Sequence, residues 1–176
     1  IFGKYDLAKN DLSRAIEQKP KDFMSIVWRG KTYLAMDQYD NALIDFNQAI
    51  RLTINLTDIY DSSRRRRARM YRGITYLFVG KYNDALADFN NCINNNGYLR
   101  NGEAAPNEAW VYFLRSLAHK LHGNEKKFLK DINRAISLVR PNNELPKTSW
   151  ELFNLGLYEL MLEHTEQADQ IYRQGI

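Results

Sequence analysis

The sequence predicts an all-α protein built as an array of antiparallel helix pairs, an α-solenoid. The chain has 176 residues with only 4 prolines and 9 glycines, which favours long helices over short strands joined by tight turns. A six-residue motif occurs four times, as DLSRAI, DFNQAI, DFNNCI and DINRAI, starting at Asp11, Asp45, Asp88 and Asp131. Successive copies lie 34, 43 and 43 residues apart, a period typical of repeats that contain two helices each.

The repeat divides residues 1–176 into one array of about four and a half units. Complete helix pairs are predicted at 22–52, 64–96, 107–140 and 148–176, whereas 1–20 provides a second helix alone. In the complete units a short turn separates two segments of about 14 residues with helical apolar periodicity. Turns are expected at Asp37-Gln38-Tyr39, Gly80-Lys81-Tyr82 and Gly123-Asn124-Glu125, and the same turn is expected at Gly3-Lys4-Tyr5.

Small residues recur at one position of the first helices. Gly30, Gly73 and Ser116 occupy this position, and we expect them to face Ala42, Ala85 and Phe128 on the second helices. A glycine inside a helix costs about 1 kcal/mol, so its recurrence indicates a close approach of two helices. In the fourth unit the bulky Phe128 replaces a small residue, which predicts that this pair splays.

This pattern resembles the tetratricopeptide repeat. The residues that carry the resemblance are Gly30, Tyr33, Tyr39, Ala42, Phe46 and Ala49, and then Gly73, Tyr76, Gly80, Tyr82, Ala85 and Phe89. The resemblance implies a right-handed superhelical array whose first helices line an inner, concave surface. It also implies a non-enzymatic scaffold that binds another protein or a peptide.

An arginine and an aspartate recur 16 residues apart in three units. The pairs are Arg29 with Asp45, Arg72 with Asp88, and Arg115 with Asp131. In the last unit both partners become apolar together, as Leu155 and Ile171. This joint change favours structural ion pairs between the two helices of a unit over a row of arginines that binds an acidic ligand.

The first helices carry apolar side chains on more sides than one core-facing stripe requires. One interpretation is that neighbouring helices or a second copy bury them. The other is a concave groove that binds an apolar or amphipathic peptide. The candidate groove residues are Met24, Val27, Trp28, Lys31, Arg67, Met70, Tyr71, Ile74, Trp110, Phe113, Leu114, Leu117, Trp150 and Phe153.

A run of arginines opens the first helix of unit 64–96. Arg64, Arg65, Arg67 and Arg69 are candidates for binding an anion or RNA, with a solvated helix start as the alternative. A net charge of +4 is small for a nucleic-acid-binding protein, and aromatic residues are not interleaved with the run as base stacking requires. Nucleic acid is therefore an unlikely partner.

The remaining reactive residues form no recognisable catalytic or metal-binding site. The single cysteine, Cys92, excludes a disulfide framework, and it occupies a slot that alanine fills in other units. His119 and His122 have no third ligand at a supporting spacing, so we expect neither a metal nor another cofactor. No apolar stretch is long enough to span a membrane. The sequence thus predicts an interaction scaffold, with an anion-binding module or a regulatory region of a larger enzyme as alternatives, and it allows self-association.

Overall fold

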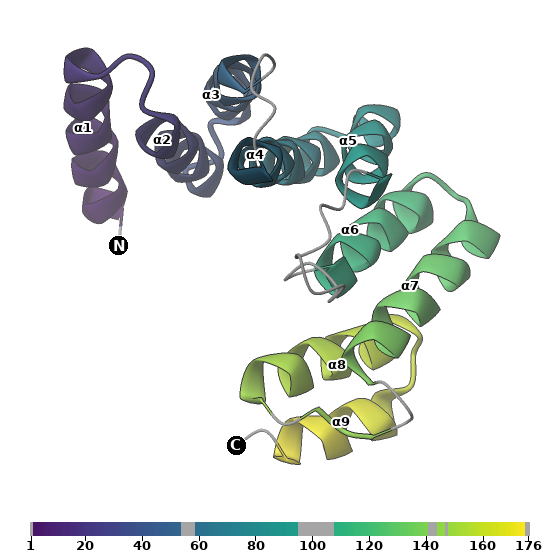
Figure 1. Cartoon of the computed structure of the whole chain (residues 1–176). Coiled ribbons are helices and arrows are strands. Elements are labelled where there is room, and N and C mark those ends of the chain that lie inside the picture. Colours follow the sequence, from purple (N-terminus) through teal and green to yellow (C-terminus); the bar gives the residue numbers. More distant parts are fainter. Residues whose placement is uncertain (1, 54–58, 95–107, 141–143, 147, 175–176) are drawn as a thin grey trace. The chain divides into compact units, whose positions relative to one another are not determined.

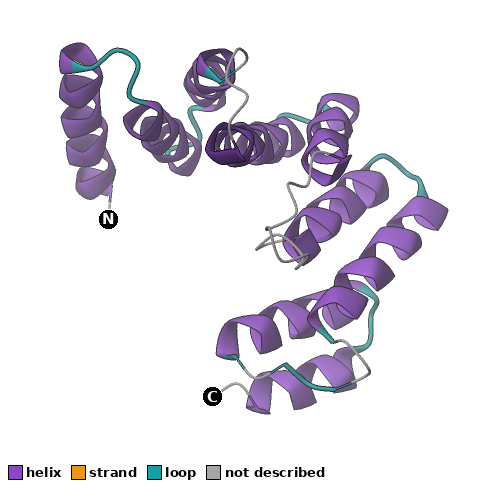
Figure 2. Ribbon diagram, viewed as in Figure 1, coloured by secondary structure: helices purple, strands orange, loops and turns teal. Residues whose placement is uncertain are grey.

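Every regular element of the described residues is an α-helix. The computed structural model describes residues 2–53, 59–94, 108–140, 144–146 and 148–174, and Figure 2 shows helices joined by short loops over these ranges. The chain divides into two compact units, Ile1–Tyr98 and Leu99–Ile176, and each is described by itself. The predicted all-α array of helix pairs is confirmed for the helices within each unit.

The first unit contains five helices (Figure 1): α1 (Phe2–Gln18), α2 (Phe23–Ala35), α3 (Tyr39–Leu52), α4 (Ile59–Phe78) and α5 (Tyr82–Asn94). Short turns join α2 to α3 and α4 to α5, and each of these pairs packs along its length. Helix α3 also packs on α4, and α1 packs on α2 in the equivalent way. The fourth helix begins at Ile59, five residues before the predicted unit boundary.

The second unit contains two helix pairs. Helices α6 (Glu108–Leu121) and α7 (Glu125–Val139) form the first pair, and α8 (Ser149–Met161) and α9 (Thr165–Gln174) form the second. The side chains of Asn124 and Thr148 cap α7 and α8 by accepting hydrogen bonds from the backbone N–H groups of Lys127 and Glu151. These caps explain why the two helices begin where they do.

Each turn within a pair has one residue with a positive φ at the same place. Gly80 and Gly123 have φ values of 72° and 78°, and Asp37 and Glu163 adopt φ values of 57° and 66° without the freedom of glycine. The left-handed residue ends one helix and starts the next within about three residues. The turn that we expected around Gly3 is absent, because that glycine lies in the first turn of α1.

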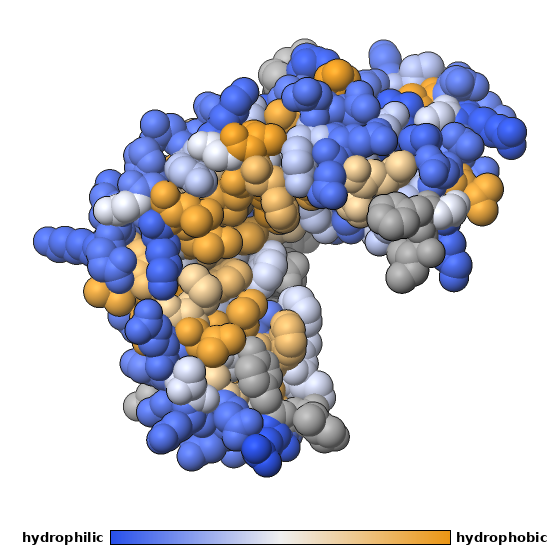
Figure 3. Space-filling model, turned by 180° about the vertical axis from the view of Figure 1, so that it is seen from behind, coloured by the Kyte–Doolittle hydropathy of each residue, from blue (hydrophilic) through white to orange (hydrophobic). Residues whose placement is uncertain are grey.

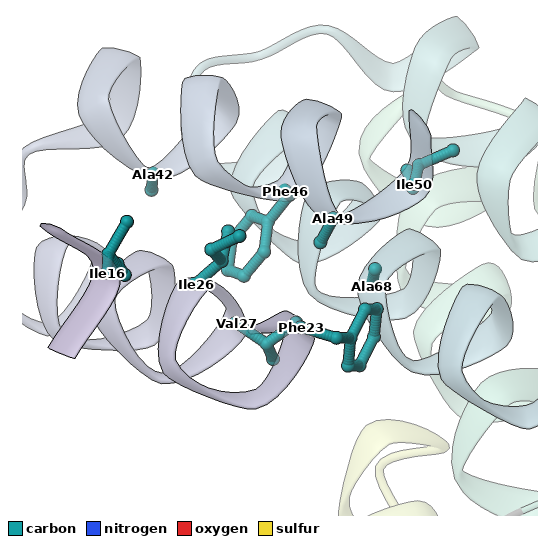
Figure 4. Packing of buried hydrophobic residues seen from close by; sticks show 9 residues of the cluster. All are labelled: Ile16, Phe23, Ile26, Val27, Ala42, Phe46, Ala49, Ile50 and Ala68. Carbon is teal, nitrogen blue, oxygen red and sulfur yellow. The ribbon is translucent and has the colours of Figure 1, made fainter. Parts of the chain in front are cut away.

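In the first unit, the core shown in Figure 4 lies mainly between α2 and α3, the first and the second helix of one pair. Phe46 and Ala49 from α3 and Ile26 and Val27 from α2 belong to one buried cluster, and all four are at most 1% exposed; Ile26 lies beside the Phe46 ring. The recurrent glycine is explained by the phenylalanine of the motif. A Cβ atom added to Gly30 would lie only 2.7 Å from Cε1 of Phe46.

The second pair repeats this arrangement, since a Cβ atom added to Gly73 would lie 2.7 Å from Cε1 of Phe89. The close approach that we predicted is therefore present, but the nearest atoms belong to a phenylalanine ring rather than to Ala42 or Ala85. The glycine leaves room for Cδ1, Cε1 and Cζ of the ring.

The helix pair α6/α7, which is the repeat 107–140, does not splay as we expected from Phe128. Phe128, Ile132 and Ala135 of α7 are at most 2% exposed against α6. Ser116 takes the glycine position, and Ile132 takes the place of the phenylalanine ring that crowds the glycine in the other pairs. The buried Ser116 hydroxyl donates to the carbonyl oxygen of Phe113, 2.7 Å away, so its polar group is satisfied inside the helix.

Candidate functional site

Three arginines of the first helices bind aspartates of the second helices. Nε and Nη2 of Arg72 donate to the two carboxylate oxygens of Asp88, both at 2.7 Å. Arg29 donates to Asp45 at 2.9 and 2.8 Å, and Arg115 donates to Asp131 at 2.7 Å through both nitrogens. The aspartates are only 1–3% exposed. The predicted ion pairs are thus present, and these arginines do not form an open row for an acidic ligand.

In Arg29 and Arg72, the third guanidinium nitrogen, Nη1, reaches the second helix of the preceding repeat. Nη1 of Arg29 donates to the hydroxyl of Ser13 on α1 at 3.3 Å, and Nη1 of Arg72 donates to Oδ1 of Asn47 on α3 at 2.6 Å. One guanidinium therefore joins its own second helix to the second helix of the unit before. The hydrogen bond to the aspartate raises the pKa of Arg29 and of Arg72 above the ordinary arginine value.

The sequence carried a signal for this contact that we did not interpret. The third residue of the repeated motif is Ser13, Asn47, Asn90 or Asn133, and each is polar. It lies two residues after the aspartate, so the same helix presents both acceptors on different sides. At Ser13 and Asn47 this polar side chain accepts the hydrogen bond from the arginine of the following unit.

A mixed aromatic and cationic surface lies on the first helices of the first unit. We call it the α2/α4 surface, and its residues are Met24, Trp28, Lys31, Arg67, Met70, Tyr71 and Ile74. Trp28 is 48% exposed, Arg67 is exposed, and the other five are partly exposed. Val27, which we expected here, is 1% exposed and belongs to the buried core cluster that also contains Phe23 and Ala68. Figure 3 colours one face of the whole molecule by hydropathy, and hydrophobic residues gather there among hydrophilic ones, mainly away from α1 and α2.

A lysine between two aromatic rings is the centre of the α2/α4 surface. Nζ of Lys31 lies 3.8 Å from the ring centroid of Trp28 and 4.7 Å from that of Tyr71. Tyr71 in turn stacks on the buried Phe46 ring, with centroids 5.9 Å apart. The lysine is thus held against a rigid aromatic base, and its charge stays at the surface. A second cation is close by, since Nη1 of Arg67 lies 3.9 Å from Sδ of Met24.

The second unit has its own aromatic surface on α6 and α8, which we call the α6/α8 surface (Trp110, Leu117, Trp150 and Phe153). Trp150 and Phe153 are 57% and 53% exposed, and the rings of Trp110 and Trp150 lie 6.4 Å apart between centroids. The expectation that Phe113 and Leu114 line an open surface is wrong, because each is only 5% exposed. The reason for Phe113 is its packing, since its ring stacks on the buried Tyr158 at 4.9 Å.

The arginine run makes several separate contacts. Arg65 donates hydrogen bonds to the carbonyl and hydroxyl oxygens of Thr53, at the end of α3. Arg66 donates to the carbonyl oxygen of Cys92 in the last turn of α5 at 3.0 Å. Both guanidinium groups therefore neutralise the negative end of a neighbouring helix dipole.

The other arginines of the run face other partners. The guanidinium of Arg64 lies 5.8 Å from the ring centroid of Phe23, Arg67 belongs to the α2/α4 surface, and Arg69 is partly buried. Among the described residues, these contacts of the run spread over different helices and do not converge on one anion site.

Two potentially reactive side chains, those of Cys92 and His119, are buried. Cys92 is buried, its Sγ lies 3.4 Å from the carbonyl oxygen of Arg66, and burial raises the pKa of its thiol to about 12. His119 is also buried, and desolvation lowers its pKa although Asp131 lies 3.8 Å away. Over the described residues no group of three potential metal ligands comes together, and no helix is long and apolar enough to cross a membrane.

Comparisons with known proteins agree with this architecture. Residues 25–53, which cover most of α2 and all of α3, match the tetratricopeptide repeat family. No curated protein sequence matches the chain.

Three solved structures show the same fold. MamA from Desulfovibrio magneticus RS-1, residues 41 to the end, is 17% identical with a TM-score of 0.59, and 98% of this chain aligns with 84% of that one. The nearly identical TPR-like repeats of a putative kinesin light chain from Podosopora anserina are 12% identical with a TM-score of 0.68, covering 98% and 85%. YrrB, described as a TPR protein with an unusual peptide-binding site, is 15% identical with a TM-score of 0.57, covering 93% and 74%.

Proposed function

We propose that the chain is a tetratricopeptide repeat scaffold, as the match of residues 25–53 to that family and the shared fold suggest, and that its α2/α4 surface binds a peptide segment. The ligand would place an apolar or aromatic side chain against Trp28 and an acidic group beside Lys31 and Arg67. The observation that carries the proposal is the exposed Trp28 ring with a lysine ammonium 3.8 Å from its centre. Trp is among the residues that dominate binding energy at protein interfaces.

The arrangement of charges supports an acidic rather than a neutral peptide. Lys31 already stacks on two rings, so a ligand carboxylate would add an ion pair without first having to order the lysine side chain. Arg67 is the second exposed cation on the same surface. An apolar contact flanked by a charge pair at its edge would be specific in orientation as well as in composition.

The α6/α8 surface is a second candidate contact, proposed separately for the second unit. Trp150 and Phe153 are more exposed than Trp28, and aromatic side chains of this size are enriched in binding sites. Binding to a peptide is stated of YrrB, and for this chain it supports only the class of ligand that we propose.

An anion- or RNA-binding role for the arginine run is less well supported. Arg65 and Arg66 already donate to helix-end carbonyl groups, so a phosphate would have to compete with those contacts. A regulatory role within a larger enzyme would use the same peptide-binding surfaces and does not conflict with the proposal.

The proposal can be tested by selecting peptides from a random phage-displayed library on the immobilised chain and measuring their affinities by fluorescence anisotropy. We expect selected peptides to combine an apolar residue with Asp or Glu. Trp28→Ala should weaken them by at least 2 kcal/mol, or about 30-fold, because the truncation removes the main apolar contact. Lys31→Glu should weaken them further.

Ile44→Ala is the matched control, since Ile44 is 61% exposed on α3, outside both proposed surfaces. It should leave the affinity unchanged. Selected peptides that bind Trp28→Ala and wild type equally well, and lose affinity with Trp150→Ala instead, would transfer the proposal to the α6/α8 surface. Loss of affinity with neither variant would refute both surfaces.

A further inference from the structure

A small pocket lies beside the turn that joins α2 to α3, within the first unit. We call it the α3/α4 pocket. Its volume is about 300 Å³, and it is lined by Asp37, Gln38, Tyr39, Asp40, Asn41 and Val79. Val79 directly follows α4, so two successive helix pairs form the pocket. Ligand pockets have volumes of about 300–1,000 Å³, and this one at the lower limit therefore suits a single inserted side chain.

An aromatic pair borders the α3/α4 pocket. The rings of Tyr39, the first residue of α3, and Phe78, the last residue of α4, stack with centroids 5.7 Å apart and an interplanar angle of 10°. Phe78 is 63% exposed. The fold does not require an aromatic ring there, because the equivalent residues at the ends of α2 and α6 are Ala35 and Leu121. The stack thus leaves much of the Phe78 ring available to a ligand.

Two carboxylates make the α3/α4 pocket negative. Asp37 accepts a hydrogen bond of 2.8 Å from the hydroxyl of Tyr39, which holds its carboxylate at the edge of that ring. Asp40 lies in the first turn of α3 and is exposed. Among the described residues neither aspartate forms an ion pair, and the exposed Lys81, two residues after Val79, pairs with neither of them. No cation of the described chain therefore neutralises the pocket.

The turn between the two helices does not need these carboxylates. The equivalent turn between α4 and α5 has Gly80 in place of Asp37 and Asn83 in place of Asp40. Asp37 and Gly80 both have a positive φ, of 57° and 72°, and glycine adopts such a φ at less cost than aspartate. The acidic lining is therefore a property of this pocket and not of the repeat.

We propose that the α3/α4 pocket binds an arginine side chain of a partner protein. The planar guanidinium would lie against the aromatic pair, and its N–H groups would donate to the carboxylates of Asp37 and Asp40. A guanidinium stacks on an aromatic face and presents a rigid fork of donors to carboxylates, whereas the ammonium of lysine is a compact charge without that fork. The pocket therefore recognises arginine in preference to lysine.

A metal ion matches this lining less well than an arginine does. Over the part of the chain that the structure describes, no three potential metal ligands among His, Cys, Asp and Glu come together. The side-chain oxygen of Gln38 already accepts a hydrogen bond of 3.3 Å from Nδ2 of Asn41. A metal ion would also make no use of the exposed Phe78 ring, whereas a flat organic cation contacts both the ring and the carboxylates.

The partner of the α3/α4 pocket differs in charge from the peptide proposed for the α2/α4 surface. That surface presents Lys31 and Arg67, which favour an acidic ligand and repel an arginine. The two sites thus select segments of opposite charge, and each can fail its test without affecting the other.

The proposal can be tested by NMR titration of the 15N-labelled full chain with an acetylated, amidated peptide Gly-Ser-Arg-Ser-Gly. We expect saturable shifts of the backbone N–H signals of Tyr39, Asp40 and Val79. The same peptide with lysine in place of arginine should bind about threefold more weakly or worse. Free arginine should also bind more weakly than the peptide, because its own carboxylate would meet the carboxylates of the pocket.

Two variants remove the two parts of the α3/α4 pocket. Phe78→Ala should weaken the arginine peptide about two- to fivefold, because it removes one exposed cation–π contact. Asp37→Asn/Asp40→Asn should weaken it about fivefold or more, because both ion pairs are lost. All three residues lie at the surface, so signals outside the pocket should stay unchanged and show that the variants are folded.

Leu121→Ala and Asp84→Asn are the matched controls. Leu121 is 49% exposed at the position on α6 that Phe78 has on α4, and Asp84 lies in the first turn of α5 as Asp40 does in α3. Both variants should bind the arginine peptide like wild type, and so should Trp28→Ala. Loss of binding in Trp28→Ala would place the peptide on the α2/α4 surface and overturn the proposal.

Four further results would overturn it. They are equal affinities of the arginine and lysine peptides, shifts that persist undiminished in Phe78→Ala and in the double aspartate variant, the absence of any saturable shift, and tighter binding of free arginine or of calcium chloride at the same signals. Light scattering that shows a dimer lost in Phe78→Ala would also overturn the proposal, because a second copy of the chain would then occupy the pocket.

Discussion

Removal of one arginine from the α4/α5 pair should destabilise the protein far more than removal of the whole ion pair. In Arg72→Leu the carboxylate of Asp88 keeps its 3% exposure but loses two hydrogen bonds of 2.7 Å and its only counter-charge in the pair. Breaking a buried ion pair by removing one partner typically costs about 3–5 kcal/mol. The loss of the hydrogen bond from Nη1 to Asn47 adds to this cost.

Replacement of both partners should cost much less, and the chain contains the natural example. Leu155 and Ile171 occupy the arginine and aspartate positions of the α8/α9 pair, and they are 0% and 6% exposed. In Arg72→Leu/Asp88→Ile the buried charge is gone and apolar contact replaces it. The remaining cost is the unpaired Asn47 side chain, about 1–2 kcal/mol. We therefore expect a coupling free energy of about 2 kcal/mol or more between the two sites.

The cycle can be measured by urea unfolding followed by circular dichroism at 222 nm, with wild type, both single variants and the double variant. The matched control is the pair of Arg173 and Asp169, which has the same 2.7 Å separation but side chains that are 76% and 60% exposed. Its cycle should show no measurable coupling. Losses in Arg72→Leu and Asp88→Ile that add up in the double variant would refute the reasoning.

Three further outcomes follow from the packing. Gly73→Ala should lower the free energy of unfolding by about 1–3 kcal/mol, because the added Cβ would lie 2.7 Å from the Phe89 ring, whereas Gly3→Ala, with nothing within 4 Å, should be neutral or stabilising in a thermal melt. Native protein at pH 8 should resist alkylation of Cys92 by maleimide, since burial raises its pKa to about 12, and rapid labelling without denaturant would contradict this. Burial lowers the pKa of His119 below its ordinary value of 6.5. As the pH falls, the imidazole of His119 is therefore protonated in the unfolded chain before it is protonated in the folded chain. Protonation thus favours the unfolded chain, and the free energy of unfolding should fall as the pH drops through about 6.5. His119→Gln should flatten that dependence in urea titrations at pH 5 and 8.

The repeated register was sufficient to predict the helix pairs and their ion pairs. The spacing of 16 residues, which recurs in three repeats, places Arg72 and Asp88 opposite each other on two antiparallel helices. The joint replacement of the pair by Leu155 and Ile171 in the last repeat indicated direct contact. The third contact of the arginine was missed although Asn47 stood in the motif. A polar residue on a helix surface usually faces solvent, and only the packing of α4 on α3 turns this one into an acceptor.

The assignment of surface residues was less successful for a geometric reason. Val27 and Trp28 are neighbours in sequence and lie about 100° apart around the helix, so a small error in the direction of the inner surface exchanges a core residue for an exposed one. The direction depends on how far α2 rotates against α3, which the contact of Gly30 with the Phe46 ring determines. Sequence periodicity identifies the apolar stripe but does not supply that rotation.

The position of the arginine contacts has a consequence for how such an array can grow by gene duplication. A duplicated block that contains one helix pair carries both members of its ion pair, so Arg72 and Asp88 would arrive together and already neutralised. The acceptor for the third nitrogen lies in the block before, as Asn47 does for Arg72. Each inserted block therefore brings a complete ion pair, and the third contact of its arginine depends on one polar residue two positions after the aspartate of its predecessor.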